Sequence, residues 1–160
     1  MTASARLTSS GALVLHYELR GEADGIHIPA PQPPSAADGL WQYTCCEAFV
    51  AGGDGQEYRE FNFSPSGQWA AYRFLAYRER DAAFVPPVAP KSEFHRLTDG
   101  FRLTAQIAPE LLPATRTFKI GLSAVLEASD GGKSYWALAH AAAQPDFHLR
   151  QSFTLTLDRP

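Results

Sequence analysis

Hydrophobic and polar residues alternate along most of the chain with a period of two. In the segment 101–107, apolar side chains occupy every second position and are separated by Arg102, Thr104 and Gln106. Strand side chains point alternately to two faces, so this pattern predicts strands with one apolar and one polar face. The pattern predicts strands over residues 12–19, 44–51, 57–64, 68–79, 93–98, 101–108, 117–128, 134–140 and 153–157.

Short segments rich in glycine, aspartate, serine and proline separate these strands. Residues 52–55, 64–67, 98–100 and 130–132 have this composition, which predicts hairpin turns. Two proline-rich segments, 29–34 and 85–90, cannot donate ladder hydrogen bonds and are expected to form extended loops. A single helical turn is predicted at 109–112, ended by Pro113.

Many short antiparallel strands without helices indicate an all-β protein, folded as an antiparallel, jelly-roll-like β-sandwich. The chain has 160 residues, so we expect one domain spanning 1–160. Hydrophobic residues make up 45% of the chain, enough apolar mass to exclude intrinsic disorder.

Charge and cysteine usage narrow the set of partners. Lysine and arginine number 14 against 17 acidic residues, and no basic cluster occurs, so nucleic acid is not an expected partner. The longest apolar run near the start, 12–15, is far shorter than the roughly 20 residues of a membrane span, and it is too short for a signal segment. We therefore expect no membrane partner and a cytoplasmic location.

Cys45 and Cys46 are adjacent, point to opposite faces of an extended segment and are expected to pack as free thiols.

Aromatic and polar side chains share strand faces at several places. Trp41 and Glu47 have the same parity in 41–49, and Glu60 and Asn62 form the polar face of the next strand. Aromatic rings cover the C–H face of a sugar, while carboxylate, amide and guanidinium groups bind its hydroxyls. The predicted ligand-binding residues are Trp41, Glu47, Glu60, Asn62, Arg73 and Trp136.

Each of these residues also has a structural interpretation. Trp41 could fill the interior or its rim, Glu47 could pair with Arg73, and Glu60 and Asn62 could form a solvated face. A carboxylate pair such as Glu47 and Glu60 could also catalyse glycoside hydrolysis, which depends on a separation that sequence does not give. No GxSxG, HExxH or phosphate-binding glycine motif occurs, and the five histidines are dispersed. We therefore expect no enzyme activity, no metal and no cofactor.

Several segments together resemble the DOMON-like proteins related to family 9 carbohydrate-binding modules. They are 40–50, which carries Trp41 and Glu47, then 58–72, 121–125, 135–138 and 145–148, so that the resemblance covers roughly 10–157. It implies a β-sandwich in which Trp41, Glu47 and Trp136 contact a sugar. Other DOMON relatives bind haem, commonly through Met and His, and here Met1 is the only methionine.

The sequence thus predicts a non-catalytic domain that binds a small saccharide on a concave sheet face. One alternative is a haem-binding, electron-transfer domain. Another is a structural or protein-interaction domain without a small-molecule site, its protein partner unknown.

Overall fold

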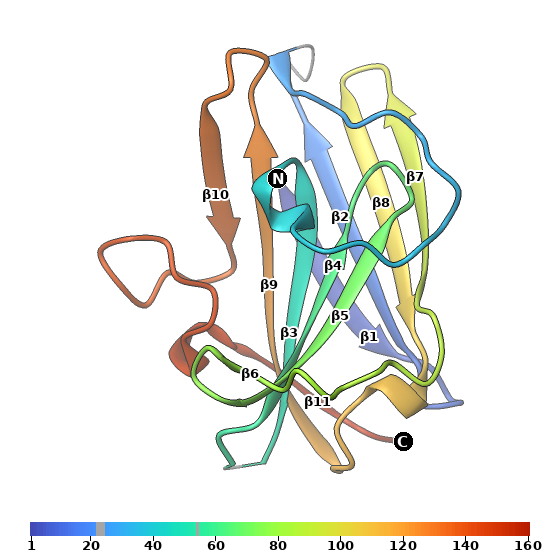
Figure 1. The fold of residues 1–160 in the computed structure, drawn as a ribbon, viewed down its shortest axis with the longest axis vertical. Helices are drawn as coiled ribbons and strands as arrows, with labels where there is room; N and C mark the ends of the chain where they lie inside the picture. Colours follow the sequence, from blue (N-terminus) through green and yellow to red (C-terminus); the bar gives the residue numbers. More distant parts are fainter. Residues whose placement is uncertain (22–24, 54) are drawn as a thin grey trace.

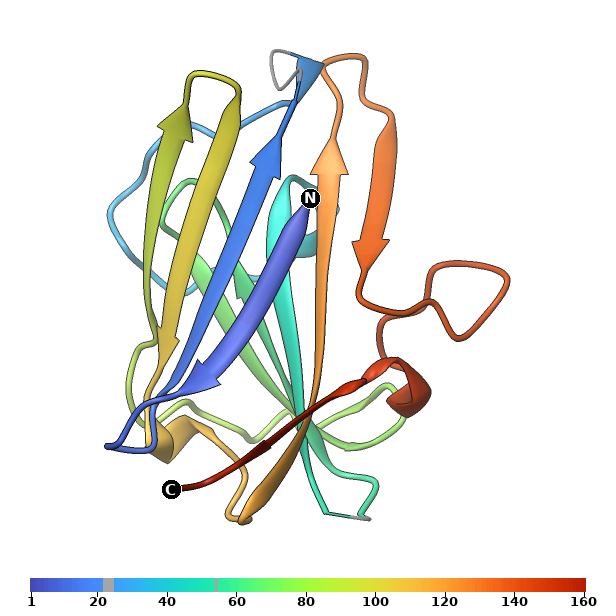
Figure 2. The same cartoon turned by 180° about the vertical axis from the view of Figure 1, so that it is seen from behind.

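Two antiparallel sheets pack face to face in the computed structural model, which describes residues 1–21, 25–53 and 55–160 (Figures 1 and 2). The smaller sheet has the strand order β1-β2-β8-β7. Its strands are β1 (Thr2–Leu7), β2 (Leu13–Arg20), β7 (Lys91–Leu97) and β8 (Gly100–Ile107). The predicted all-β sandwich is confirmed.

The larger sheet has the order β10-β9-β3-β4-β5-β6, and β11 pairs with the first half of β9. Its strands are β3 (Cys45–Gly52), β4 (Tyr58–Phe63), β5 (Trp69–Ala76), β6 (Glu79–Arg80), β9 (Thr117–Glu127), β10 (Lys133–Ala137) and β11 (Leu155–Asp158). The structure also has short 3-10 turns, among them η2 (Leu40–Gln42), η3 (Pro109–Leu111) and η4 (Arg150–Ser152). None of the described helical segments is long and apolar enough to cross a membrane.

The structure adds two strands that the hydrophobic pattern did not predict. Strand β1 pairs with β2 at the edge of the smaller sheet and is only half-buried, so small residues such as Ala3 and Ala5 suffice on its inner side. The predicted strand 68–79 is instead a hairpin of β5 and β6, because Arg78 takes a left-handed conformation with φ of 57° between them.

The predicted turns and loops agree with the structure where it describes them. Hairpins connect β4 to β5, β7 to β8 and β9 to β10 at the expected segments. The first predicted turn, between β3 and β4, contains Asp54, which lies outside the described residues. The segments 29–34 and 85–90 form no strands, and η3 is the helical turn predicted at 109–112.

The larger sheet is buried on both faces. Its inner face packs against the smaller sheet, with Cys46, Ala48 and Val50 of β3 contributing to that core. Its outer face carries a second apolar cluster that includes Cys45 and Phe49, covered by Leu40 of η2 and by Phe153 just after η4. The two free cysteines are thus buried on opposite faces, as predicted.

Candidate functional site

A cavity of about 460 Å³ lies on the outer face of the larger sheet. Its floor is formed by side chains of three neighbouring strands, listed here in chain order: Glu47, Phe49, Glu60, Tyr72 and Phe74. The floor therefore combines aromatic rings with two carboxyl groups.

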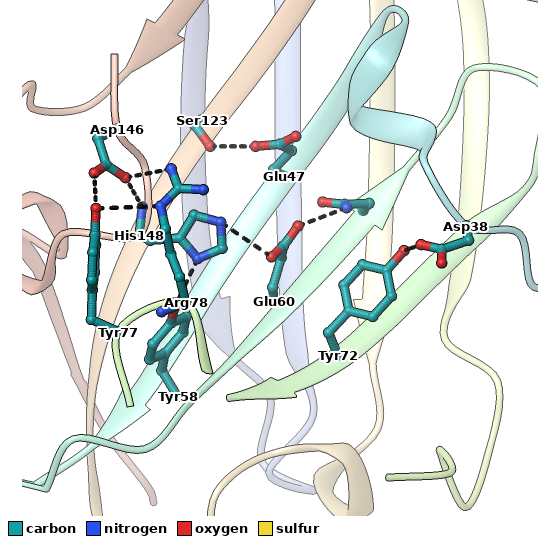
Figure 3. Close-up of polar contacts among 11 residues, drawn as sticks. Asp38, Glu47, Tyr58, Glu60, Tyr72, Tyr77, Arg78, Ser123, Asp146 and His148 are labelled. Carbon is teal, nitrogen blue, oxygen red and sulfur yellow. Dashed lines mark hydrogen bonds and ion pairs between the residues drawn. The ribbon is translucent and has the colours of Figure 1, made fainter. Parts of the chain in front are cut away.

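Strand register explains why these side chains meet. Phe49 of β3 is paired with Glu60 of β4, and Glu60 is paired with Tyr72 of β5. Paired residues of adjacent antiparallel strands project on the same face. Glu47 lies two residues before Phe49 and is paired with Asn62 on one side and Ser123 of β9 on the other. Figure 3 shows Ser123, Glu47, Glu60 and Tyr72 on this face of the sheet.

Glu47 is the more deeply buried of the two carboxyl groups, with an exposed fraction of 3%. Its Oε2 atom accepts a hydrogen bond of 3.2 Å from the Ser123 hydroxyl (Figure 3). Burial, and secondly the negative charge of Glu60, raise the pKa of Glu47 to about 8. Glu47 can therefore exchange a proton near neutral pH.

Glu60 is hydrogen-bonded to Asn62 of the same strand. The amide Nδ2 of Asn62 donates a 2.8 Å hydrogen bond to Glu60 Oε1. Burial raises the pKa of Glu60 to about 7, despite the opposing effects of the Asn62 hydrogen bond and of Arg80 and Arg78. Asn62 is fully buried, and its Oδ1 atom has no hydrogen-bond partner among the described residues.

His148 closes one side of the cavity and is electrically neutral near pH 7. Burial, and secondly the charge of Arg78, lower the pKa of His148 to about 4. The Tyr58 hydroxyl accepts a hydrogen bond from the Arg78 backbone N–H and lies 2.8 Å from His148 Nδ1. The other ring nitrogen, Nε2, lies 3.7 Å from Glu60 Oε2.

Two pairs of opposite charges lie at the rim. Arg80 stacks over the Tyr72 ring at 4.1 Å and contacts Asp38 at 3.3 Å, and the Tyr72 hydroxyl donates a hydrogen bond to the same carboxylate. On the other side, Arg78 contacts Asp146 at 2.9 Å (Figure 3). Both rim arginines are therefore neutralised by aspartates of the chain.

Aromatic side chains from outside the three floor strands form the walls. Trp41 lies in η2 rather than in the strand from which its parity was counted, and 52% of its surface is exposed. Gly39, with φ of 71°, starts this turn. Tyr135 of β10 and Phe147 complete the walls, with 6.3 Å between their ring centroids.

The structure brings together most of the residues predicted from sequence. Trp41, Glu47 and Glu60 all line the cavity, and Asn62 is hydrogen-bonded to Glu60. The alternative that Glu47 pairs with Arg73 is wrong, since Glu47 bonds to Ser123.

Arg73 and Trp136 lie away from this cavity. Arg73 is paired across strands with Arg59, on the opposite face from Glu60, and its guanidinium binds Glu57 and Asp81. Trp136 is paired with Ala124 on the inner side of the sheet and borders a small hollow near Met1.

Sequence reasoning missed several cavity residues. Tyr135 occupies the place expected for Trp136, because its partner Val125 is on the outer face. Alternation places Tyr72 on the opposite face of its strand from Arg73, so the sequence pattern could have indicated it. Which side chains from other segments reach the cavity depends on tertiary packing. The other missed residues are Asp38, Arg78, Phe147 and His148 in loops and Arg80 in the short strand β6.

Comparisons with known proteins bear on the fold. No protein-family model matches the chain, and no curated protein matches it. A solved structure from Bacteroides uniformis ATCC 8492, described as a "putative carbohydrate-binding protein", is similar over 92% of this chain and 72% of its own. The TM-score is 0.69 and the sequence identity is 15%. The chain therefore shares the β-sandwich fold of that protein.

Proposed function

We propose that the outer cavity is a non-catalytic binding site for a small saccharide. The observation that carries this proposal is that Trp41 and Glu47, with Glu60, line one cavity. An exposed indole provides a flat apolar surface for the C–H face of a pyranose ring. Carboxyl groups beneath it can accept and donate hydrogen bonds to the hydroxyls.

The size of the cavity favours a binding site over a purely structural domain. A volume of about 460 Å³ lies within the range of roughly 300–1,000 Å³ that is typical of small-molecule sites. Trp41, at its wall, keeps half of its surface exposed instead of filling the space. A sheet face that had lost its ligand would be expected to be filled by its own side chains.

We propose binding rather than glycoside hydrolysis as the role of the two carboxyl groups. Glu47 and Glu60 come from neighbouring strands of one sheet face, and both lie in the floor of the cavity, where they can bind hydroxyls of a sugar ring. The description of the Bacteroides uniformis protein as carbohydrate-binding also supports this proposal, as does the resemblance to DOMON-like proteins related to family 9 carbohydrate-binding modules.

The same cavity is less suited to haem. One ring nitrogen of His148 lies at hydrogen-bond distance from Tyr58, and the other faces Glu60. Met1 borders the hollow beside Trp136, on the other side of the larger sheet. A Met and His ligand pair of the kind that other DOMON relatives use would have to span the sheet.

Titration calorimetry against a panel of neutral and charged mono- and disaccharides tests the proposal. We expect millimolar or tighter affinity for at least one sugar, and Trp41→Ala should weaken it about tenfold. Trp136→Ala is the matched control, because Trp136 is similarly exposed at 45% but faces away from the cavity. No heat with any sugar at millimolar concentration, or an equal loss in both variants, would contradict the proposal.

A further inference from the structure

The charges around the cavity balance at its rim but not at its floor. Arg80 is paired with Asp38 and Arg78 with Asp146, so each rim guanidinium already has a carboxylate. Among the described residues, the ion pairs leave no lysine or arginine in contact with Glu47 or Glu60. The two floor carboxyls therefore have no cation in direct contact, and the charges of Arg78 and Arg80 only partly offset the effect of burial on the pKa of Glu60.

Each floor carboxyl also has one oxygen that is free for a ligand. Glu47 is bonded through Oε2 to the neutral Ser123 hydroxyl, and Glu60 through Oε1 to the neutral Asn62 amide. Among the described residues, nothing hydrogen-bonds to Glu47 Oε1. The neutral His148 ring is 3.7 Å from Glu60 Oε2, beyond hydrogen-bond length. Both carboxyls are more than nine-tenths buried and line the cavity.

Two buried carboxyl groups on adjacent strands cannot both ionise at low cost without a positive charge. In the unliganded site they retain protons to higher pH than exposed carboxyls do, because burial raises the pKa of each. An ammonium group bound between them would supply the missing charge. The faces of Trp41 and Tyr135 nearby also attract cations.

We propose that this cavity selects amino sugars carrying a free, protonated amino group, which is bound by Glu47 and Glu60 while the sugar ring lies against Trp41. This inference rests on the proposed saccharide site and specifies its ligand class. An acidic sugar is the opposite case, since it could be bound only by drawing Arg78 or Arg80 away from its aspartate.

Calorimetry with four sugars of one ring type tests this selectivity: glucosamine, glucose, N-acetylglucosamine and glucuronic acid. At about pH 7 we expect the wild-type protein to bind glucosamine at least about tenfold more tightly than the other three. Glucosamine binding should also release protons, detected as a dependence of the heat on the buffer, because the bound ammonium favours ionised carboxylates.

Substitution of the carboxyls tests their role. The double variant Glu47→Gln/Glu60→Gln keeps the side-chain shapes, and we expect it to lose both the preference for glucosamine and the proton release. Glu93→Gln, an exposed carboxyl on β7 of the other sheet, is the matched control and should retain both. The wild-type panel needs no variant, so a misfolded double variant would leave the test intact.

The outcomes separate this inference from the function on which it rests. Equal or tighter binding of glucose, N-acetylglucosamine or glucuronic acid would overturn the amino-sugar inference and leave the saccharide site standing. A preference for glucosamine that survives in the double variant would also overturn it. If no sugar binds, or if the simple amine cyclohexylamine binds while no sugar does, the saccharide site itself is wrong.

Discussion

The two faces of the larger sheet are buried to a similar extent but by different means. On β3, Cys46 and Val50 of the inner face have no exposed surface, and Glu47 and Phe49 of the outer face have 3% and 2%. A second sheet seals the inner face, which is almost entirely apolar. Short turns and loops cover the outer face, and they leave a cavity with ionisable groups in it. A strand face that is covered by loops can therefore carry a binding site, while the opposite face of the same strand, covered by a second sheet, forms the core.

The largest expected effect is on stability and comes from a substitution in the core at the inner face. Phe61 of β4 is fully buried between the sheets, and we expect Phe61→Ala to lower the free energy of unfolding by about 3–5 kcal/mol, through lost burial and the cavity created. Denaturant unfolding monitored by fluorescence measures this change. Val88→Ala, in an exposed loop, should change stability by less than about 0.5 kcal/mol. Similar values for the two variants would mean that the inner face is not the main core.

The outer face should make stability depend on pH. The pKa values of Glu47 and Glu60 are raised to about 8 and about 7 from an ordinary value of 4.5, so the folded state binds more protons than the unfolded state. Their contribution to the free energy of unfolding therefore falls as pH rises from about 4.5 to 8. His148, with its pKa lowered to about 4, acts in the opposite direction and costs stability as pH falls below about 6.5.

Thermal unfolding across this pH range, in the wild type and in Glu47→Gln/Glu60→Gln, isolates the carboxyl contribution. The double variant should gain stability relative to wild type as pH rises from 5 to 8. Glu93→Gln should follow the wild type, because that carboxyl is exposed. If the difference in stability between the wild type and the double variant stays constant with pH, Glu47 and Glu60 do not have the raised pKa values described above.

A smaller effect, on sugar binding, is expected at β10, whose side chains point alternately to the two faces of the larger sheet. Tyr135 lines the cavity while the next residue, Trp136, lies on the other side. Tyr135→Ala should weaken sugar binding about threefold to tenfold, since the ring is a wall rather than the main platform. Tyr43→Ala is the matched control, because Tyr43 is also about half exposed at 51% but does not line the cavity. Calorimetry showing equal effects of the two substitutions would remove Tyr135 from the site.

The same pair of residues shows how far sequence reasoning reaches. Alternation located the strands, put Glu60 and Asn62 on one face of their strand and gave Glu47 its face on another, because the side-chain period within a regular strand is fixed. The pairing of β3 with β4 then brings the three residues to one face of the sheet. Alternation did not indicate which face of β10 points outward, and a shift of one position exchanged Tyr135 for Trp136. His148 and Arg78 come from segments far from β3 in sequence, so only the packing of the loops brings them to the cavity.

The smallest expected effect concerns Arg73, which lies on β5 between the cavity residues Tyr72 and Phe74 but points to the other face. Its bidentate contact with Glu57, at 3.0 and 2.9 Å, is at the surface, so we expect Arg73→Ala to lower the free energy of unfolding by at most about 1 kcal/mol. Sugar affinity should stay within about twofold of the wild type, because the side chain does not reach the cavity. Arg80→Ala on the adjacent strand is the informative counterpart, since Arg80 stacks on Tyr72 at the rim. If calorimetry shows that Arg73→Ala weakens sugar binding more than Arg80→Ala does, the two faces are not independent and the site extends through the sheet.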